Sequence, residues 1–171
     1  SGNKYTSGWY MDTVDFDPDI DVDEHTSNGD RDMYLGSFDT DGNFLWVRTW
    51  GGTMSDIGYD VTVDEPDNLF VTGSFQDIVD FDPGPGTDEH LSNGGDDGFI
   101  ARYTTSGAFL WARTWGGSDL DIGRGLTTDA SGNLFSTGYF EGAVDFDPGP
   151  GLDNHTSMGG YEAFLSKFLP Y

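Results

Sequence analysis

Short stretches of alternating hydrophobic and polar residues, separated by turn-forming residues, run along the whole chain. In the middle third such stretches cover residues 59–64, 69–75, 97–103 and 108–115. Alternation with a period of two turns one side of an extended segment toward a core, which is typical of a half-buried β-strand. Gly-containing turns, such as 104–107 and its counterpart 39–42, separate the last two stretches and are typical of β-hairpins. The pattern therefore predicts an all-β protein.

The same pattern returns at a fixed interval of 65 residues. Val-Asp-Phe-Asp-Pro occurs at 14–18, 79–83 and 144–148, and Leu-Trp-(Val/Ala)-Arg-Thr-Trp-Gly-Gly occurs at 45–52 and 110–117. No gaps are needed to align the copies, so the chain is a tandem repeat. We predict units over 1–52, 53–117 and 118–171, the first and last partial, so that the 171 residues hold about 2.6 units.

Each unit carries the pattern of a propeller blade. Four predicted antiparallel strands, a tryptophan on the last strand and a Gly-Gly exit are typical of this architecture. An insertion over 76–96 separates the second and third strands of the middle unit. Its Pro-Gly pairs cannot extend a strand ladder, so we expect a loop that projects from one rim and opens with a short strand at 78–81. The predicted fold is all-β, with tandem four-stranded antiparallel propeller-type blades.

Two strings in the middle unit carry a resemblance to a known family. Asp-Asn-Leu-Phe-Val-Thr-Gly-Ser-Phe at 67–75, followed by Asp-Gly-Phe-Ile-Ala-Arg-Tyr and Trp-Gly-Gly within 97–117, resembles the bacterial SBBP-type β-propeller repeat. The resemblance covers essentially the whole chain and implies a secreted or surface protein with tandem repeats. The Asp-Phe-Asp-Pro-Gly insertion is longer than the plain repeat. The family implies no particular activity.

The number of units bears on assembly. Propellers normally close with about 4–8 blades, so 2.6 units cannot close a ring, and open strand edges invite pairing with another chain. One expectation is head-to-tail association of identical chains by strand addition, which gives rings or open filaments. The alternative is that flanking repeats of the same protein supply the missing blades. The chain begins at Ser1 without a charged-then-apolar leader, so we expect a mature, processed chain or a piece of a longer one.

Composition narrows the range of partners. Seven Lys and Arg stand against 31 Asp and Glu, which gives a formal net charge of −24. This balance argues against nucleic acid and against anionic membrane surfaces, because both need a basic patch. The longest apolar runs, such as 108–112, are far shorter than the ~20 residues of a membrane span, so no membrane insertion is expected. The chain has no cysteine, which excludes disulfides and thiolate metal sites.

The Asp-Phe-Asp motif is the strongest candidate for chemistry. On an extended backbone, side chains two residues apart point the same way, so Asp80 and Asp82 share one side while Val79 and Phe81 face the core. Paired carboxylates repel each other unless a cation lies between them, and the carbonyls of Pro-Gly-Pro-Gly are ligands suited to Ca²⁺. The alternative is that these aspartates cap turns through their side chains. The predicted Ca²⁺ ligands are Asp15, Asp17, Asp19, Asp21, Asp80, Asp82, Asp145 and Asp147.

Two further patterns repeat in phase. His25, His90 and His155 each follow an aspartate by two residues, which favours a hydrogen-bonding anchor for the insertion over a metal ligand, because one group recurs in every unit. The Trp-x-Arg-x-Trp strings at 46–50 and 111–115 place Trp, Arg and Trp on one side of a strand. Their repetition favours packing between blades through cation–π contacts. A flat platform for sugar rings is the alternative.

The sequence therefore predicts a non-enzymatic extracellular or cell-surface scaffold of bacterial type that is calcium-stabilised and self-assembles head to tail into a filament or ring. We find no Gly-rich phosphate cradle, nucleophile elbow or Ser-His-Asp arrangement. The second class is a carbohydrate-binding adhesin or lectin-like module of a larger secreted protein. A third is a fragment of a carbohydrate-active enzyme, because paired carboxylates can serve glycoside hydrolysis. This function would require one unit to carry a constellation that the others lack.

Overall fold

The fold was analysed in a computed structural model, which describes residues 2–64 and 68–168. All regular elements in these residues are β-strands, sixteen in number, so the all-β prediction is confirmed. The described part of the chain contains no helix long and apolar enough to cross a membrane.

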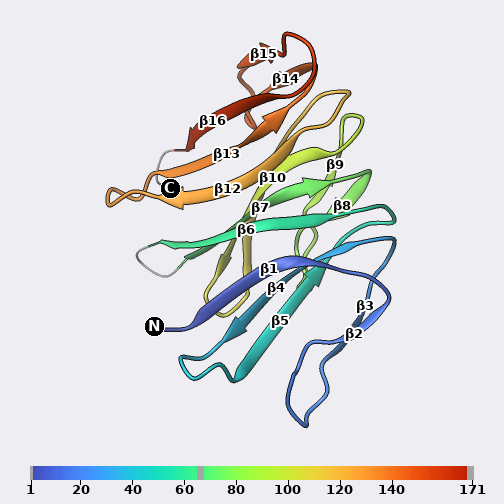
Figure 1. The fold of residues 1–171 in the computed structure, drawn as a ribbon, viewed down its shortest axis with the longest axis vertical. Coiled ribbons are helices and arrows are strands. Elements are labelled where there is room, and N and C mark those ends of the chain that lie inside the picture. Colours follow the sequence, from blue (N-terminus) through green and yellow to red (C-terminus); the bar gives the residue numbers. More distant parts are fainter. Residues whose placement is uncertain (1, 65–67, 169–171) are drawn as a thin grey trace.

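Three antiparallel sheets follow one another along the chain (Figure 1). The middle sheet has four strands in the order β11-β10-β7-β6, whereas the first sheet has the order β1-β4-β5 and the third the order β12-β13-β16. The first sheet comprises β1 (Lys4–Tyr10), β4 (Asp32–Phe38) and β5 (Phe44–Trp50); the middle sheet β6 (Ile57–Asp64), β7 (Asn68–Phe75), β10 (Asp97–Thr104) and β11 (Phe109–Trp115); the third sheet β12 (Ile122–Thr128), β13 (Leu134–Phe140) and β16 (Glu162–Phe168). The four strands predicted for the middle unit are confirmed to within two residues at each end.

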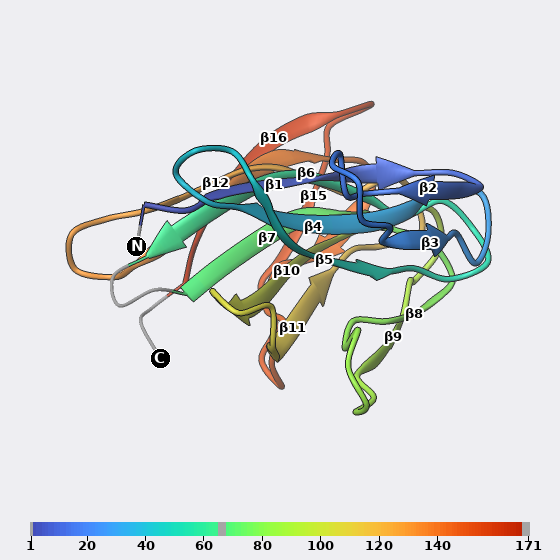
Figure 2. The same cartoon turned by 90° about the horizontal axis from the view of Figure 1, so that it is seen from below.

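Each sheet carries a short two-stranded ribbon, inserted between the strands equivalent to β7 and β10. The ribbons are β2 (Thr13–Asp15) with β3 (Glu24–Thr26), β8 (Ile78–Asp80) with β9 (Glu89–Leu91), and β14 (Ala143–Asp145) with β15 (Asn154–Thr156). All three lie toward the side of the molecule away from the start of β1 and the end of β16 (Figure 1). Figure 2 shows the β8–β9 ribbon projecting away from the strands of the middle sheet. The predicted short strand at 78–81 is confirmed, whereas its partner β9 was not predicted.

A residue with left-handed backbone begins each ribbon. Its φ is 58° at Asp12, 59° at Asp77 and 72° at Gly142, a region that suits Gly and is tolerated by Asp. The N–H of each of these residues donates to a serine hydroxyl at the end of the same ribbon, and the serine N–H donates back to the carbonyl. In the middle ribbon the first of these bonds joins Asp77 N to Ser92 Oγ at 2.9 Å. The reciprocal pair closes the base of every ribbon.

Two hydrophobic clusters bury the facing sides of the three sheets. The first cluster joins Met33, Leu35 and Trp50 of the first sheet to residues of the middle sheet such as Phe99 and Tyr103. The second cluster joins side chains of the middle sheet to side chains of the third, and its members are Phe70, Ile100, Trp115, Leu134, Phe140, Val144 and Phe164. The middle sheet is therefore covered on both faces, whereas each outer sheet packs against a neighbour on one face.

Candidate functional site: the aspartate ribbons and the buried carboxyl groups

The first aspartate of each Asp-Phe-Asp motif holds its own ribbon closed. Oδ1 of Asp80 accepts the N–H of Asp82 at 3.1 Å and the N–H of Asp88, eight residues along, at 2.8 Å. The equivalent carboxylates Asp15 and Asp145 accept the equivalent pairs of N–H groups. These bonds hold the pKa of Asp145 below its usual range, because N–H donors stabilise the ionised form. One oxygen of this carboxylate therefore has a structural role in every copy.

The second aspartate caps the turn that follows. Oδ1 of Asp82 accepts the N–H of Gly84 at 2.7 Å, and Oδ1 of Asp147 accepts the N–H of Gly149 at 2.8 Å. In the first ribbon Asp17 accepts the N–H of Asp19 at 2.9 Å. Side-chain acceptance two residues along is the usual turn chemistry of aspartate.

These contacts place the eight predicted calcium ligands in three separate ribbons. Val79 and Phe81 are fully buried, so the predicted inward side of the motif is confirmed. Asp19 and Asp21 lie in the exposed loop of the first ribbon. Within the described residues, no three acidic, histidine or cysteine side chains lie close enough together to hold a metal ion. Calcium binding by Asp15, Asp17, Asp19, Asp21, Asp80, Asp82, Asp145 and Asp147 stays a prediction.

The histidines bridge the ribbons to the outer strands where such a strand is present. His25 Nδ1 lies 2.8 Å from Thr49 Oγ1 on β5, and His90 Nδ1 lies 3.1 Å from Thr114 Oγ1 on β11. All three histidines also contact the aspartate two residues earlier, at 3.1–3.4 Å. The described part of the third sheet has no strand equivalent to β11, and the side chain of His155 is 58% exposed against 24% for His90. These contacts support the anchor interpretation.

Sequence analysis missed a set of buried carboxyl groups at the junctions between sheets. Asp56 is fully buried after the Gly-Gly exit of β5 and accepts the N–H groups of Gly52 at 2.7 Å and Gln76 at 3.0 Å. Asp121 does the same after β11, with the N–H groups of Gly117 and Glu141. Each carboxyl ties the exit of one sheet to the ribbon entry of the next. Burial raises the pKa of Asp56 to about 6, although its two N–H partners oppose the shift.

A second carboxyl lies near each of these, at the start of the third strand of a unit. Asp32 and Asp97 are each 1% exposed. Asp97 Oδ2 accepts the N–H and the side-chain N–H of Asn93 at 3.0 Å, while its buried Oδ1 has no hydrogen-bond partner. Burial raises the pKa of Asp97 to about 7, and the charge of Asp121 adds to the shift. A Cβ on Gly116 would collide with this carboxyl group, so the Gly-Gly exit leaves the space that Asp97 occupies.

A sequence signal for this set did exist. Asp32 and Asp97 share one repeat phase, and Asp56 and Asp121 share another, four residues after the second Gly of Trp-Gly-Gly. Aspartate is usually a surface residue, so neither position indicated burial. Burial raises the pKa of this set, to about 6 for Asp56 and to about 7 for Asp97.

The tryptophan–arginine strings pack between sheets. Arg48 lies over the ring of Trp46 at 5.3 Å, and Arg113 lies over Trp111 at 5.1 Å. A Cβ on Gly107, in the β10–β11 turn of the middle sheet, would lie 3.1 Å from both the Trp46 ring and Arg48 Nε. The first string therefore packs against the turn of the next sheet, as its repetition predicts.

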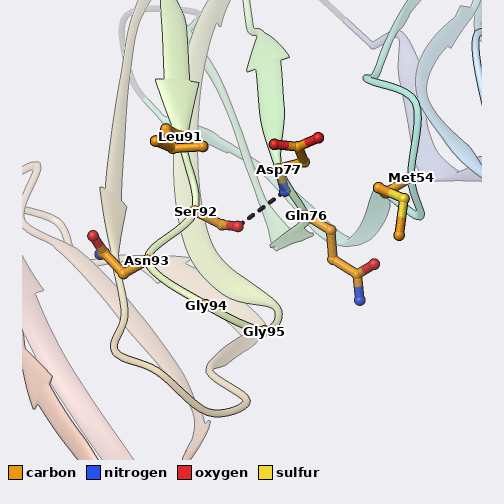
Figure 3. A pocket seen from close by; sticks show the side chains of 8 residues that line it. All are labelled: Met54, Gln76, Asp77, Leu91, Ser92, Asn93, Gly94 and Gly95. Atoms are coloured by element: carbon orange, nitrogen blue, oxygen red, sulfur yellow. Dashed lines mark hydrogen bonds between the residues drawn. The ribbon is translucent and has the colours of Figure 1, made fainter.

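Figure 3 shows a shallow pocket on the rim of the middle unit, with a cavity volume of about 420 Å³. Met54 and Leu91 contribute its apolar side chains, and Ser92 Oγ accepts the N–H of Asp77 at its edge. The lining is Met54, Gln76, Asp77, Leu91, Ser92, Asn93, Gly94 and Gly95. Among the described residues of this lining, Asp77 is the one acidic side chain, and none is a histidine, lysine or arginine.

Comparisons with known proteins support a repeat-type β fold and no specific activity. No family model matches the chain. The chain is 28% identical over 141 residues to an uncharacterized WD repeat-containing protein of Acanthamoeba polyphaga mimivirus. The aligned region covers 77% of this chain and 10% of that protein. It is also 26% identical over 152 residues to the regulatory protein FlaEY of Caulobacter vibrioides. Here the aligned region covers 89% of this chain and 15% of that protein. The chain therefore spans only a small part of either relative.

Proposed function

We propose that the three sheets are propeller-type blades of the SBBP type, and that the chain is a non-enzymatic extracellular scaffold protein. It assembles head to tail, with calcium bound at the aspartate ribbons, into a filament or ring at a cell surface. The WD-repeat relative favours the propeller-type arrangement.

One observation carries the scaffold proposal: the distinctive residues of each unit are used to hold that unit and its neighbour. The first aspartate closes the ribbon in all three copies. The buried carboxyls Asp56 and Asp121 tie one unit to the next in two successive junctions. An active site usually arises once in a molecule, whereas these arrangements recur with the repeat.

Sizing and negative-stain microscopy of the native chain, with and without a calcium chelator, test the assembly. Ordered rings or filaments that dissociate on chelation are the expected result. Small particles that are indifferent to the chelator would contradict both the assembly and its dependence on calcium.

A pair of conservative substitutions tests the calcium site directly. Asp80→Asn with Asp82→Asn keeps an oxygen that can accept the N–H groups of Asp82, Asp88 and Gly84, but removes the charge that attracts a cation. Asp129→Asn is the matched control, because Asp129 also accepts two N–H groups in a turn and belongs to no ribbon. We expect calcium to raise the melting temperature of the double variant less than that of the native chain, because only the first and third ribbons still bind it, while the control retains the full rise. Equal calcium responses in all three proteins would exclude this site.

A carbohydrate-binding module is the second candidate, and Trp9 favours it. Trp9 is 46% exposed, and Arg31 lies over its ring at 4.6 Å from the ring centre. Aromatic rings with an adjacent hydrogen-bond donor suit the apolar face and the hydroxyls of a sugar. Retention of glycans on an array by the native chain and not by Trp9→Ala would favour this function. No retention by either protein would count against it.

A further inference from the structure

The middle ribbon differs from the other two at one exposed pair of positions beside the pocket of Figure 3. Ile78 and Leu91 face each other across this ribbon and are 52% and 63% exposed. The equivalent pairs are Thr13 with Thr26 in the first ribbon and Ala143 with Thr156 in the third. Of the three described ribbons, the middle one alone has two large apolar side chains at this pair. Large apolar side chains that gather on a surface are typical of a binding site.

Met54 forms a second apolar side of the pocket, and its repeat equivalent is a carboxylate. Met54 is 48% exposed and follows the Gly-Gly exit of β5, whereas Asp119 stands at this position after β11. The carboxylate of Asp119 lies so close to Gly142 that a Cβ on that glycine would collide with it. In the middle unit Asp77 stands at the glycine position and carries a Cβ. The two exchanges replace a charged contact by a pocket with apolar sides.

The polar side of the pocket is held in place by hydrogen bonds and by close packing. Ser92 is fixed by its reciprocal bonds with Asp77 at the base of the ribbon. The side chain of Asn93 donates to the carbonyl of Gly116 at 3.1 Å. The two glycines that follow pack so closely against the exit of the middle sheet that neither has room for a side chain. This side is therefore formed before a ligand arrives, as in most small-molecule sites.

The charge of the pocket restricts the ligand that it suits. In the part of the chain that the structure describes, neither carboxylate oxygen of Asp77 has a hydrogen-bond or ion-pair partner. In the view of Figure 3 this carboxylate lies between Leu91 and Met54. A neutral apolar ligand would remove water from the carboxylate without replacing its hydrogen bonds, which is costly. An anion is repelled by a chain whose formal net charge is −24.

We propose that this pocket binds an alkylammonium group. The alkyl chain lies against Met54 and Leu91, and the ammonium group pairs with the carboxylate of Asp77 and replaces its lost water. A free amine carries this chemistry, and so does a lysine side chain of another protein. The inference goes beyond the scaffold function, and it depends neither on self-assembly nor on calcium.

Chain length separates this pocket from the general attraction of a cation to an acidic protein. An ammonium ion beside any solvent-exposed carboxylate gains nothing from its alkyl chain. In the pocket, each methylene that contacts the apolar side chains should raise the affinity about two- to fourfold. Added salt should weaken binding, because it screens the ion pair, but the ratio between chain lengths should persist.

Amide NMR of the whole chain, titrated with butylammonium or hexylammonium chloride in the presence of a calcium chelator, tests the proposal. We expect hexylammonium to bind about four- to sixteenfold more tightly than butylammonium, since the two differ by two methylenes. The shifts should concentrate at 76–78 and 91–95. Equal affinities for the two amines would overturn the proposal.

Three conservative variants locate the site. Asp77→Asn removes the charge and keeps a residue that tolerates left-handed backbone; it should lower the affinity for hexylammonium about three- to fivefold, as expected for a solvent-exposed ion pair. Asp12→Asn is the matched control, because Asp12 has the same backbone and the same serine bond in the first ribbon. Leu91→Thr introduces the residue found at both equivalent positions and should bring the two amine affinities closer together.

The variants also decide against the proposal if it is wrong. Equal affinity of the native chain and Asp77→Asn for hexylammonium, or an equal loss in Asp12→Asn, would exclude this pocket. Nα-acetyl-lysine N-methylamide, used as a second probe, separates the two sources of the ligand. Weaker binding of this probe than of hexylammonium assigns the pocket to a free amine, and binding at least as tight assigns it to a lysine side chain.

Discussion

The middle and third ribbons have nearly the same sequence but different surroundings. Both place a phenylalanine of the Asp-Phe-Asp motif against two aromatic rings and a histidine. Phe81 is nevertheless fully buried, whereas Phe146 is half-buried. The histidine of the middle ribbon bonds to Thr114 on β11, whereas among the described residues the histidine of the third ribbon contacts Asp153 and no threonine.

The difference lies in the outer strand. In the middle sheet β11 is the outer strand next to β10. The N–H of Ala112 on β11 donates to Asp88 Oδ2 of the ribbon at 3.3 Å. The described part of the third sheet ends at β16. The motif therefore forms its own turn wherever it occurs, but its burial depends on the neighbouring strand. Substitutions at equivalent positions of the two units should then have different effects.

The largest expected difference is at the buried phenylalanine. Phe81→Ala should lower the free energy of unfolding by about 3–5 kcal/mol, because it leaves a cavity between two sheets. Phe146→Ala should lower it by about 1–2 kcal/mol, because that ring is already partly in water. Urea unfolding of the two variants measures both values. Equal losses would show that the outer strand contributes little to the burial of the motif.

A smaller difference is expected in the pH dependence of stability. The pKa of Asp97 is about 7 in the folded protein, against an ordinary value of 3.8. Between these values the folded state retains a proton that the unfolded state releases, so stability falls as the pH rises from about 4 to about 7. Asp97→Asn removes this penalty and should raise the free energy of unfolding at pH 8 by about 1–2 kcal/mol, with a flatter pH profile.

Glu162 is the matched position in the third unit and provides the control. It is partly exposed and accepts one N–H, from Met158, at 2.7 Å. Glu162→Gln should change the free energy of unfolding by less than about 0.5 kcal/mol, as expected for a partly exposed side chain. The free energy of unfolding, measured from pH 5 to pH 8 for the native chain and both variants, tests whether Asp97 causes the pH dependence. A profile of Asp97→Asn as steep as that of the native chain would assign the pH dependence to other groups.

The strands were predictable because their signals are local. Alternation with a period of two and Gly-containing turns lie within each segment, so 97–103 and 108–115 could be assigned without knowledge of the rest of the chain. The strand β9 could not be assigned in this way. It has only three residues, which is too few to show an alternating pattern. The bond that closes its ribbon joins the N–H of Asp88 to Asp80 Oδ1, eight residues earlier.

The buried carboxyl groups were not predictable for a different reason. Aspartate in a Gly-rich segment indicates a solvated turn, and Asp97 differs only in what surrounds it. Asn93 supplies two N–H donors, and Gly116 leaves room where any side chain would collide. Both residues are part of the tertiary arrangement. The calcium hypothesis drew on the same local signal, and the structure shows that backbone N–H groups bond to one oxygen of each first aspartate.

The smallest expected difference is at the three histidines, and it isolates the contribution of the outer strand. His90→Ala removes the bond to Thr114 and a ring contact with Phe81, and should lower the free energy of unfolding by about 1 kcal/mol. His25→Ala should have a similar effect, because His25 bonds to Thr49 on β5. His155→Ala should change stability by less than about 0.5 kcal/mol, as expected for an exposed side chain. Equal losses in all three urea titrations would mean that the aspartate two residues earlier, and not the outer strand, makes the histidine an anchor.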